Sequence, residues 1–99
     1  GDARVERIIG DGVGRDADIV VVGVGALPNV ELAGAAGLAI DNGIVVDGLC
    51  RTSDPAIFAI GDCTNHPNAL LQRRLRLESV HNALEQAKIA AAIRQVCNR

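Results

Sequence analysis

Short apolar runs bounded by turn-forming residues are the main hydrophobic pattern of the chain. Residues 19–22 are four β-branched residues in a row, and residues 57–60 are apolar throughout. Runs of this length between turn signals are typical of strands that are buried on both faces of a parallel or mixed sheet. The pattern therefore predicts two buried strands. It also predicts a short edge strand over residues 3–9, where apolar and charged side chains mix before the turn at Gly10.

Two other segments have helical spacing. Residues 80–96 are predicted to form one long helix, because apolar side chains recur at helical intervals and Ser79 is a good N-cap. The apolar positions are Val80, Ala83, Leu84, Ala87 and Ala91. A shorter helix is predicted over residues 30–36, with Asn29 as its N-cap and Gly37 as the glycine that ends it.

Turns divide the middle of the chain into short segments. Asn42 and Gly43 form a turn signal, and short strands are predicted over residues 43–46 and near residues 49–51. Residues 65–68 are predicted to be a polar loop. Short strands together with a long carboxyl-terminal helix indicate the α/β class, as an incomplete two-layer piece.

Composition argues against two classes of partner. The chain has 99 residues, a formal net charge of −2 and one aromatic residue, Phe58. Nucleic-acid-binding proteins are normally basic and often stack bases on aromatic side chains, so no nucleic-acid partner is expected. The longest apolar stretch, residues 19–27, is far shorter than the roughly 18 residues that span a bilayer, so no membrane partner is expected either.

Cysteine usage favours a reducing compartment. Cys50, Cys63 and Cys97 are odd in number and widely spaced, which fits reduced thiols in the cytoplasm better than a disulfide framework. Cys63, His66 and His81 are also candidate metal ligands. Their spacing matches no zinc pattern, so no metal site is expected.

Two polar features leave alternatives open. The basic stretch at residues 73–76 is either an anion- or partner-docking patch or a solvated stretch paired with Glu78. Gly61 and Asp62 follow the second predicted strand, at the sheet edge where open α/β sheets bind ligands. A carboxylate there accepts hydrogen bonds from sugar or ribityl hydroxyls, but the same residue would also suit an exposed turn.

Three segments carry a resemblance to a known family. Residues 52–62, TSDPAIFAIGD, resemble the second flavin-binding motif of the pyridine nucleotide-disulfide oxidoreductase superfamily. Residues 18–29 resemble the segment that closes the NAD domain and crosses back to the FAD domain. Residues 76–87 resemble the ferredoxin-reductase branch, which includes putidaredoxin, rhodocoxin and rubredoxin reductases.

The resemblance implies a set of cofactor-binding residues. Gly61 and Asp62 would hold the ribityl chain of FAD, and the backbone N–H near Val80 would face the N1/O2 edge of the flavin ring. Gly25 and Ala26 would border the NAD crevice. The implied activity is FAD-dependent transfer of electrons from NAD(P)H to a ferredoxin-like iron–sulfur protein, and no residue of this chain is expected to act as a catalytic acid or base.

The resemblance also implies a domain division. Residues 1–25 would end the NAD(P)-binding domain, and residues 26–99 would be the incomplete second half of the FAD-binding domain. The chain lacks an initiator Met and both G-x-G-x-x-G motifs of the family, so we expect it to be part of a longer chain. The alternatives are a non-catalytic flavin- or partner-binding remnant, an α/β interaction module, or part of a thioredoxin-reductase-like or NADH-oxidase-like flavoenzyme.

Overall fold

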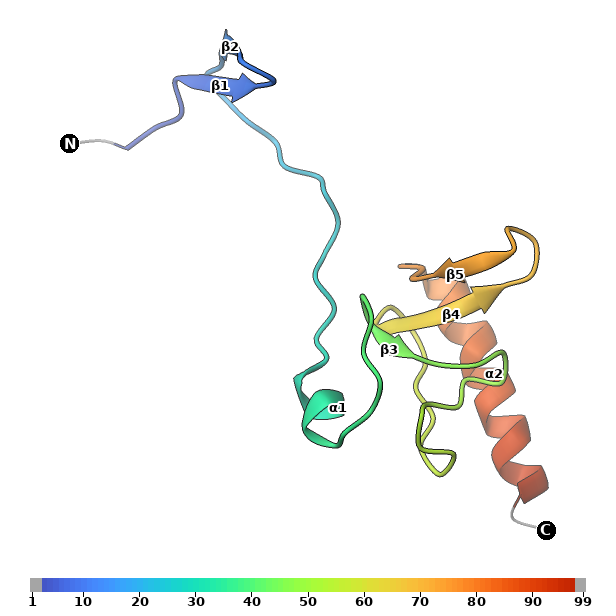
Figure 1. Ribbon diagram of the computed structural model, residues 1–99. Coiled ribbons are helices and arrows are strands. Elements are labelled where there is room, and N and C mark those ends of the chain that lie inside the picture. The colour runs from blue at the N-terminus through green and yellow to red at the C-terminus, as the bar shows by residue number, and fades with distance from the viewer. Residues whose placement is uncertain (1–2, 98–99) are drawn as a thin grey trace.

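The computed structural model describes residues 3–97, which form an extended arm and a compact body (Figure 1). The arm, residues 3–25, starts with a hairpin and continues as an extended chain. The body, residues 26–97, contains two helices and a small sheet. Because the arm projects from the body, the molecule measures 65 × 32 × 22 Å.

The hairpin at the start of the arm pairs β1 (Arg7–Gly10) with β2 (Val13–Asp16) in antiparallel register. Its two-residue turn places both Asp11 and Gly12 at positive φ, 50° and 78°, the backbone that a tight hairpin turn requires. The edge strand predicted over residues 3–9 is confirmed in part, since β1 begins only at Arg7. The second strand was not predicted.

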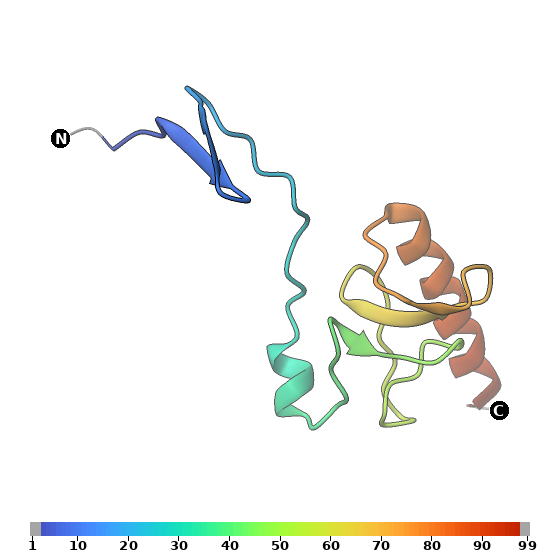
Figure 2. The same cartoon turned by 45° about the horizontal axis from the view of Figure 1, so that its top comes forward.

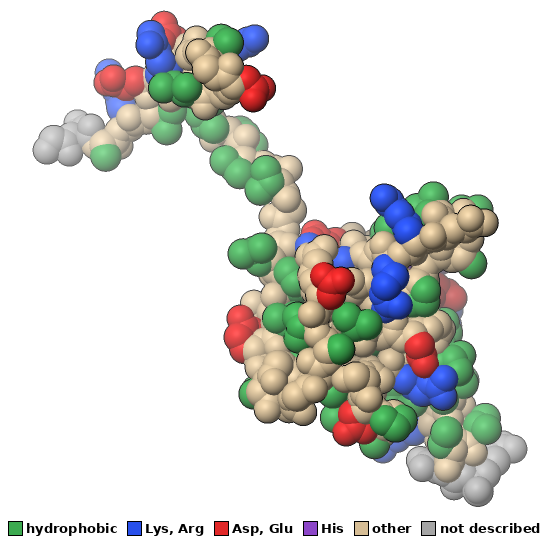
Figure 3. Space-filling view, in the orientation of Figure 1, with side chains coloured by type: hydrophobic (Ala, Val, Ile, Leu, Met, Phe, Trp, Pro, Cys, Tyr) green, Lys and Arg blue, Asp and Glu red, His purple; other side chains and the backbone are tan. Residues whose placement is uncertain are grey.

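The buried strand predicted over residues 19–22 is wrong. These residues lie in the extended part of the arm, where Ile19 and Val21 are 83% and 89% exposed. Figure 3 shows the apolar side chains spread along the arm without a neighbouring layer. β-branched residues favour an extended backbone, but a strand also needs a hydrogen-bonded partner, and none of the described residues pairs with this segment.

The body is a mixed α/β unit, which confirms the predicted fold class. Its sheet has the order β3 (Ile44–Val45), β4 (Thr64–Asn68) and β5 (Arg73–Leu75). β3 is parallel to β4, and β4 is antiparallel to β5. The long helix α2 (Val80–Cys97) lies alongside this sheet, and the short helix α1 (Glu31–Ala35) lies where the arm enters the body (Figure 2).

Two further strand assignments are corrected in the body. Residues 57–60 form no regular strand, because only Phe58 pairs, in an isolated bridge with Arg51. Ile57 and Ile60 are partly exposed rather than buried. The strand predicted near residues 49–51 is likewise reduced to that single bridge, whereas the strand predicted over residues 43–46 is confirmed as β3.

The predicted polar loop at residues 65–68 is instead the central strand β4. Thr64, Asn65 and His66 are buried in it. Asn65 accepts a hydrogen bond from Arg74 Nε at 3.1 Å and donates one to the carbonyl of Asp41 at 2.6 Å. Polar residues can fill a strand interior when their hydrogen bonds are made in this way.

The long helix begins as predicted. Ser79 Oγ accepts a hydrogen bond from the N–H of Asn82 at 3.0 Å, which is the geometry of an N-cap. The predicted apolar positions are covered only in part: Ala83 and Ala87 are half-buried, but Leu84 and Val80 are 57% and 77% exposed, and the buried residue of α2 is Gln86. The helix therefore meets the sheet through a polar side chain.

The short helix confirms its predicted end but not its predicted start. Val30 occupies the N-cap position of α1 instead of Asn29, and it makes no side-chain cap. Gly37 has a φ of 78°, and its N–H donates to the carbonyl of Gly34 at 3.0 Å. The N–H of Leu38 reaches back to the carbonyl of Ala33 at 3.0 Å, which completes a Schellman motif.

Candidate functional site

A cavity of about 260 Å³ lies where the arm joins the body. Three segments that are distant in sequence line it: the junction at residues 26–29, the turn at Asp62 and Cys63, and the approach to α2 at Arg76 and Glu78. The cavity thus contains Ala26 and Asp62 together. The sequence predicted both residues as site residues, but in different crevices.

Arg76 connects the walls of this cavity. Its Nη2 donates to the carbonyl of Ala26 at 2.8 Å, and its Nη1 donates to Glu78 Oε1 at 2.7 Å. Longer hydrogen bonds, each of 3.4 Å, reach the carbonyl of Asp62 and Asn42 Oδ1. The Arg76 side chain is only 14% exposed, whereas its partner Glu78 is 37% exposed, so the pair lies at the edge of the body with the arginine on the inner side.

Glu78 is held as a carboxylate at this site. The hydrogen bond from the Arg76 side chain, followed by one from the Ala26 backbone, lowers the pKa of Glu78 below its ordinary value. Glu78 is therefore ionised at neutral pH and neutralises the guanidinium beside it. The arginine and the glutamate together form a charge-neutral link between the junction and α2.

The turn that carries Asp62 is fixed to α2 through Gly61. The N–H of Gly61 donates to Gln86 Oε1 at 2.7 Å, and its carbonyl accepts a hydrogen bond from Thr64 Oγ1 at 2.8 Å. Gly61 has a φ of 89°, a backbone conformation that side chains disfavour. The turn is therefore held from both sides before any ligand is considered.

Asp62 lines the cavity and is exposed. Its carboxylate makes no hydrogen bond or ion pair with any residue between 3 and 97, and the backbone on either side of it is held by Gly61 and Arg76. Asp62 therefore combines a fixed backbone with a carboxylate that is free to accept hydrogen bonds. The strand that the sequence predicts before Asp62 is not formed.

Of the remaining predicted cofactor-binding residues, one lies at the junction and one lies outside the cavity lining. Gly25 has a φ of 85°, and a Cβ added there would lie 3.8 Å from Glu78 Oε1, so it belongs to the same junction. Val80 is the first residue of α2 but does not line the cavity. Sequence reasoning missed Arg76 and Glu78 as residues of this site, although one of its two interpretations of the basic stretch paired it with Glu78.

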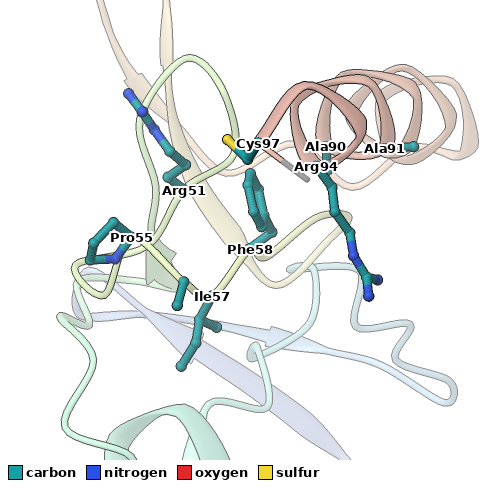
Figure 4. A pocket seen from close by; sticks show the side chains of 9 residues that line it. Arg51, Pro55, Ile57, Phe58, Ala90, Ala91, Arg94 and Cys97 are labelled. Carbon is teal, nitrogen blue, oxygen red and sulfur yellow. The ribbon is translucent and has the colours of Figure 1, made fainter. Parts of the chain in front are cut away.

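A second groove, of about 840 Å³, lies at the far end of α2 (Figure 4). One wall comes from residues 51–58 and the other from the second half of the helix. Phe58, the single aromatic residue, lines it, and Arg51 at its edge is paired with Asp47 at 2.8 Å. None of the predicted cofactor-binding residues lies in this groove.

Two kinds of site are absent from the part of the chain that the structure describes. No group of three or more His, Cys, Asp or Glu side chains among residues 3–97 is arranged to hold a metal ion. Within the same range, no helix has the length and apolar character needed to cross a membrane.

Comparison with known proteins gives consistent matches. Residues 1–87 match the family model described as pyridine nucleotide-disulphide oxidoreductase. Putidaredoxin reductase from Pseudomonas putida is 54% identical over 83 residues, which is 84% of this chain and 20% of that protein. The ferredoxin–NAD(+) reductase component of the anthranilate 1,2-dioxygenase system from Burkholderia cepacia is 58% identical over 92 residues, 93% of this chain and 22% of that protein.

Solved structures agree with these matches. The covalent complex of putidaredoxin reductase with putidaredoxin matches with a TM-score of 0.70 and 52% identity, over 90% of this chain and 21% of that chain. A ferredoxin reductase from Rhodopseudomonas palustris matches with a TM-score of 0.72 and 49% identity, over 90% of this chain and 22% of that chain. The chain spans about a fifth of the length of the relatives it matches.

Proposed function

The chain belongs to the pyridine nucleotide-disulphide oxidoreductase family, and on that premise we propose that it supplies the ribityl side of an FAD site in an NAD(P)H-dependent reductase. The observation that carries the proposal is Asp62: its turn is fixed by Gln86 and Arg76, it lines the cavity, and its carboxylate has no partner among residues 3–97. The flavin, when bound, would supply the ability to accept a hydride from the nicotinamide and to release single electrons.

The residues at the cavity fit this part of the cofactor. A ribityl chain carries hydroxyl donors, and Asp62 offers a fixed carboxylate acceptor. The cavity of about 260 Å³ is smaller than the roughly 300–1,000 Å³ of a complete ligand pocket, so it suits one part of a dinucleotide. In this proposal Gly61 and Asp62 hold the ribityl chain, the N–H near Val80 faces the flavin ring, and Gly25 and Ala26 border the nicotinamide crevice.

We also propose that the arm and the body belong to different domains. Residues 1–25 would end the NAD(P)-binding domain, and residues 26–99 would be the second half of the FAD-binding domain, with residues 1–2 and 98–99 outside the described part. The change from arm to body at Gly25 and Ala26 supports this boundary. The exposed apolar side chains at residues 19–22 support it as well, because a parallel sheet elsewhere would cover them.

The proposed electron acceptor is a ferredoxin-like iron–sulfur protein. The names of the matched relatives, putidaredoxin reductase and a ferredoxin–NAD(+) reductase component, support this choice, as does the matched complex with putidaredoxin. We further propose a cytoplasmic location. The three cysteines support it, because Cys50, Cys63 and Cys97 are free thiols.

A chimera provides the test. The 99-residue chain replaces the aligned fifth of the Pseudomonas putida putidaredoxin reductase, and the FAD dissociation constant is measured after reconstitution. Asp62→Asn should raise it about 10- to 150-fold, since a hydrogen bond to a charged group contributes about 1.5–3 kcal/mol. Asp41→Asn is the matched control, because Asp41 is exposed and its side chain bonds to no residue between 3 and 97.

Two results would contradict the proposal. The first is a chimera that does not bind FAD. The second is an equal FAD dissociation constant for Asp62→Asn and Asp41→Asn. A chimera that holds FAD but is not reduced by NAD(P)H would instead support the alternative of a non-catalytic flavin-binding remnant.

A further inference from the structure

We infer that Arg76 is a positioning residue that locks the arm-to-body junction at Ala26 onto the turn that carries Asp62. The inference rests on the proposed function, because it assigns Arg76 the task of setting the nicotinamide side of the site against the flavin side. Arg76 is the first residue of a segment that carries the resemblance, but the resemblance assigned it no role. It follows from the contacts of one side chain.

Arg76 contacts every wall of the cavity. Its guanidinium donates to the carbonyls of Ala26 and Asp62, to Asn42 and to Glu78. These partners belong to four separate segments of the chain. A guanidinium presents five N–H groups in a rigid plane, so one arginine can satisfy four acceptors that point at it from different directions.

The backbone at Gly43 lies close to the Arg76 side chain. A Cβ added to Gly43 would lie 3.2 Å from Arg76 Cδ and 2.8 Å from the carbonyl oxygen of Cys63. Glycine at this position therefore leaves the room through which the arginine reaches the junction. The arginine is therefore bordered by Gly43 on one side and paired with Glu78 at 2.7 Å on the other.

The turn at Asp62 and the junction at Ala26 depend on Arg76 to different extents. The turn at Asp62 is held independently, because Gly61 is bonded to Gln86. The junction at Ala26 contacts Arg76 at 2.8 Å and Glu78 through its N–H. Loss of Arg76 would therefore leave the flavin side nearly intact and release the junction.

This asymmetry predicts a specific kinetic pattern in the chimera. Arg76→Gln should keep the FAD dissociation constant close to that of the unsubstituted chimera. It should slow flavin reduction by NAD(P)H by up to about 100-fold, because a misplacement of about 1 Å between reactants can cost that much. The flavin reduction rate of Arg76→Lys should fall between those of Arg76→Gln and the unsubstituted chimera, since lysine keeps the charge but not the planar guanidinium. Arg15→Gln, on the exposed hairpin strand β2, is the matched control and should behave like the unsubstituted chimera.

A second measurement uses the 99-residue chain without any cofactor. Amide hydrogen exchange at Ala26 should be faster in Arg76→Gln than in the unsubstituted chain, and exchange at Gly61 should be unchanged, because Gln86 still accepts its N–H. Arg15→Gln should change neither rate. Equal exchange at Ala26 in all three chains would overturn the inference.

The two experiments separate failure of the inference from failure of the proposed function. If the unsubstituted chimera does not bind FAD, the proposed function fails, and the exchange rates alone decide whether Arg76 holds the junction. If the chimera binds FAD and Arg76→Gln is reduced as fast as Arg15→Gln, the proposed function stands and the positioning role is wrong.

Discussion

The arm and the body differ in whether they bury any apolar side chain at all. None of the apolar side chains between residues 3 and 25 is buried, and Val21 is 89% exposed, whereas the body buries Val46 to 2% exposure, although surface leucines of the body such as Leu32 are 90% exposed. Both segments are apolar in sequence. The difference lies in what surrounds them, since Val46 is covered by neighbouring segments of the body and no described segment covers residues 19–22.

The interior of the body is largely polar. The buried set contains Gln86, Thr64, Asn65 and His66 beside a few small apolar residues. Gln86 Oε1 accepts the N–H of Gly61 at 2.7 Å and lies 3.2 Å from Thr64 Oγ1. Hydrogen bonds from Gln86 therefore connect α2 to the turn at Gly61 and to β4, at a place where larger cores have apolar contacts.

The substitution Gln86→Leu should have the largest effect on this contrast. It removes the acceptor of the half-buried Gly61 N–H and buried hydrogen-bonding capacity at Thr64, and should lower the free energy of unfolding by about 3 kcal/mol, at the upper end of the cost of unsatisfied polar groups. Denaturant unfolding followed by far-UV circular dichroism provides the measurement. Gln95→Leu is the matched control on the exposed part of α2, and equal losses for the two would mean that the polar link is not stabilising.

A matched pair of valines tests the arm against the body directly. Val46→Ala should lower the free energy of unfolding by about 2 kcal/mol, from lost burial and the cavity that remains. Val21→Ala should stay within about 0.5 kcal/mol, because an exposed side chain loses little on truncation. The same unfolding measurement applies, and a large loss at Val21 would show that the arm packs against the body in solution.

The smallest effect concerns pH and His66. Burial, together with the nearby positive charge of Arg74, lowers the pKa of His66 below 6.5 in the folded chain. The unfolded chain therefore takes up a proton first as the pH falls, so stability present above pH 6.5 is lost between that pH and the lower folded-state pKa. His66→Gln should flatten this slope, while His81→Gln, at an exposed position, should keep it. A slope that His66→Gln leaves unchanged would assign the loss to another group.

Local signals explain what could be predicted from sequence. The start of α2 follows from Ser79, and the end of α1 follows from Gly37, because a cap acts within one turn of its helix. The strands at residues 19–22 and 57–60 were wrongly predicted because pairing depends on distant partners. β4 was missed because the polar side chains of Thr64 and Asn65 are bonded by Gln86 and Arg74, which belong to other elements of the body.

Residues of the candidate site were likewise predicted where the signal is local in sequence and missed where it depends on distant contacts. Asp62 and Gly61 were predicted because a strand-like run and a glycine precede the carboxylate in sequence. Arg76 was missed as part of the site because its role depends on contacts with residues as distant as Ala26, which no spacing rule reveals. One of the two interpretations of the basic stretch, a solvated stretch paired with Glu78, is confirmed in the pairing: Glu78 is exposed and bonded to Arg76, whose own side chain is only 14% exposed.

The position of Asp62 relative to bound FAD is the most direct test of the proposed site, and a crystal structure of the FAD-bound chimera measures it. We expect an Asp62 carboxylate oxygen within about 3 Å of a ribityl hydroxyl, with Arg76 still bonded to the carbonyl of Ala26. A structure in which other residues hold the ribityl chain, while the Asp62 carboxylate points into solvent, would contradict the proposed site.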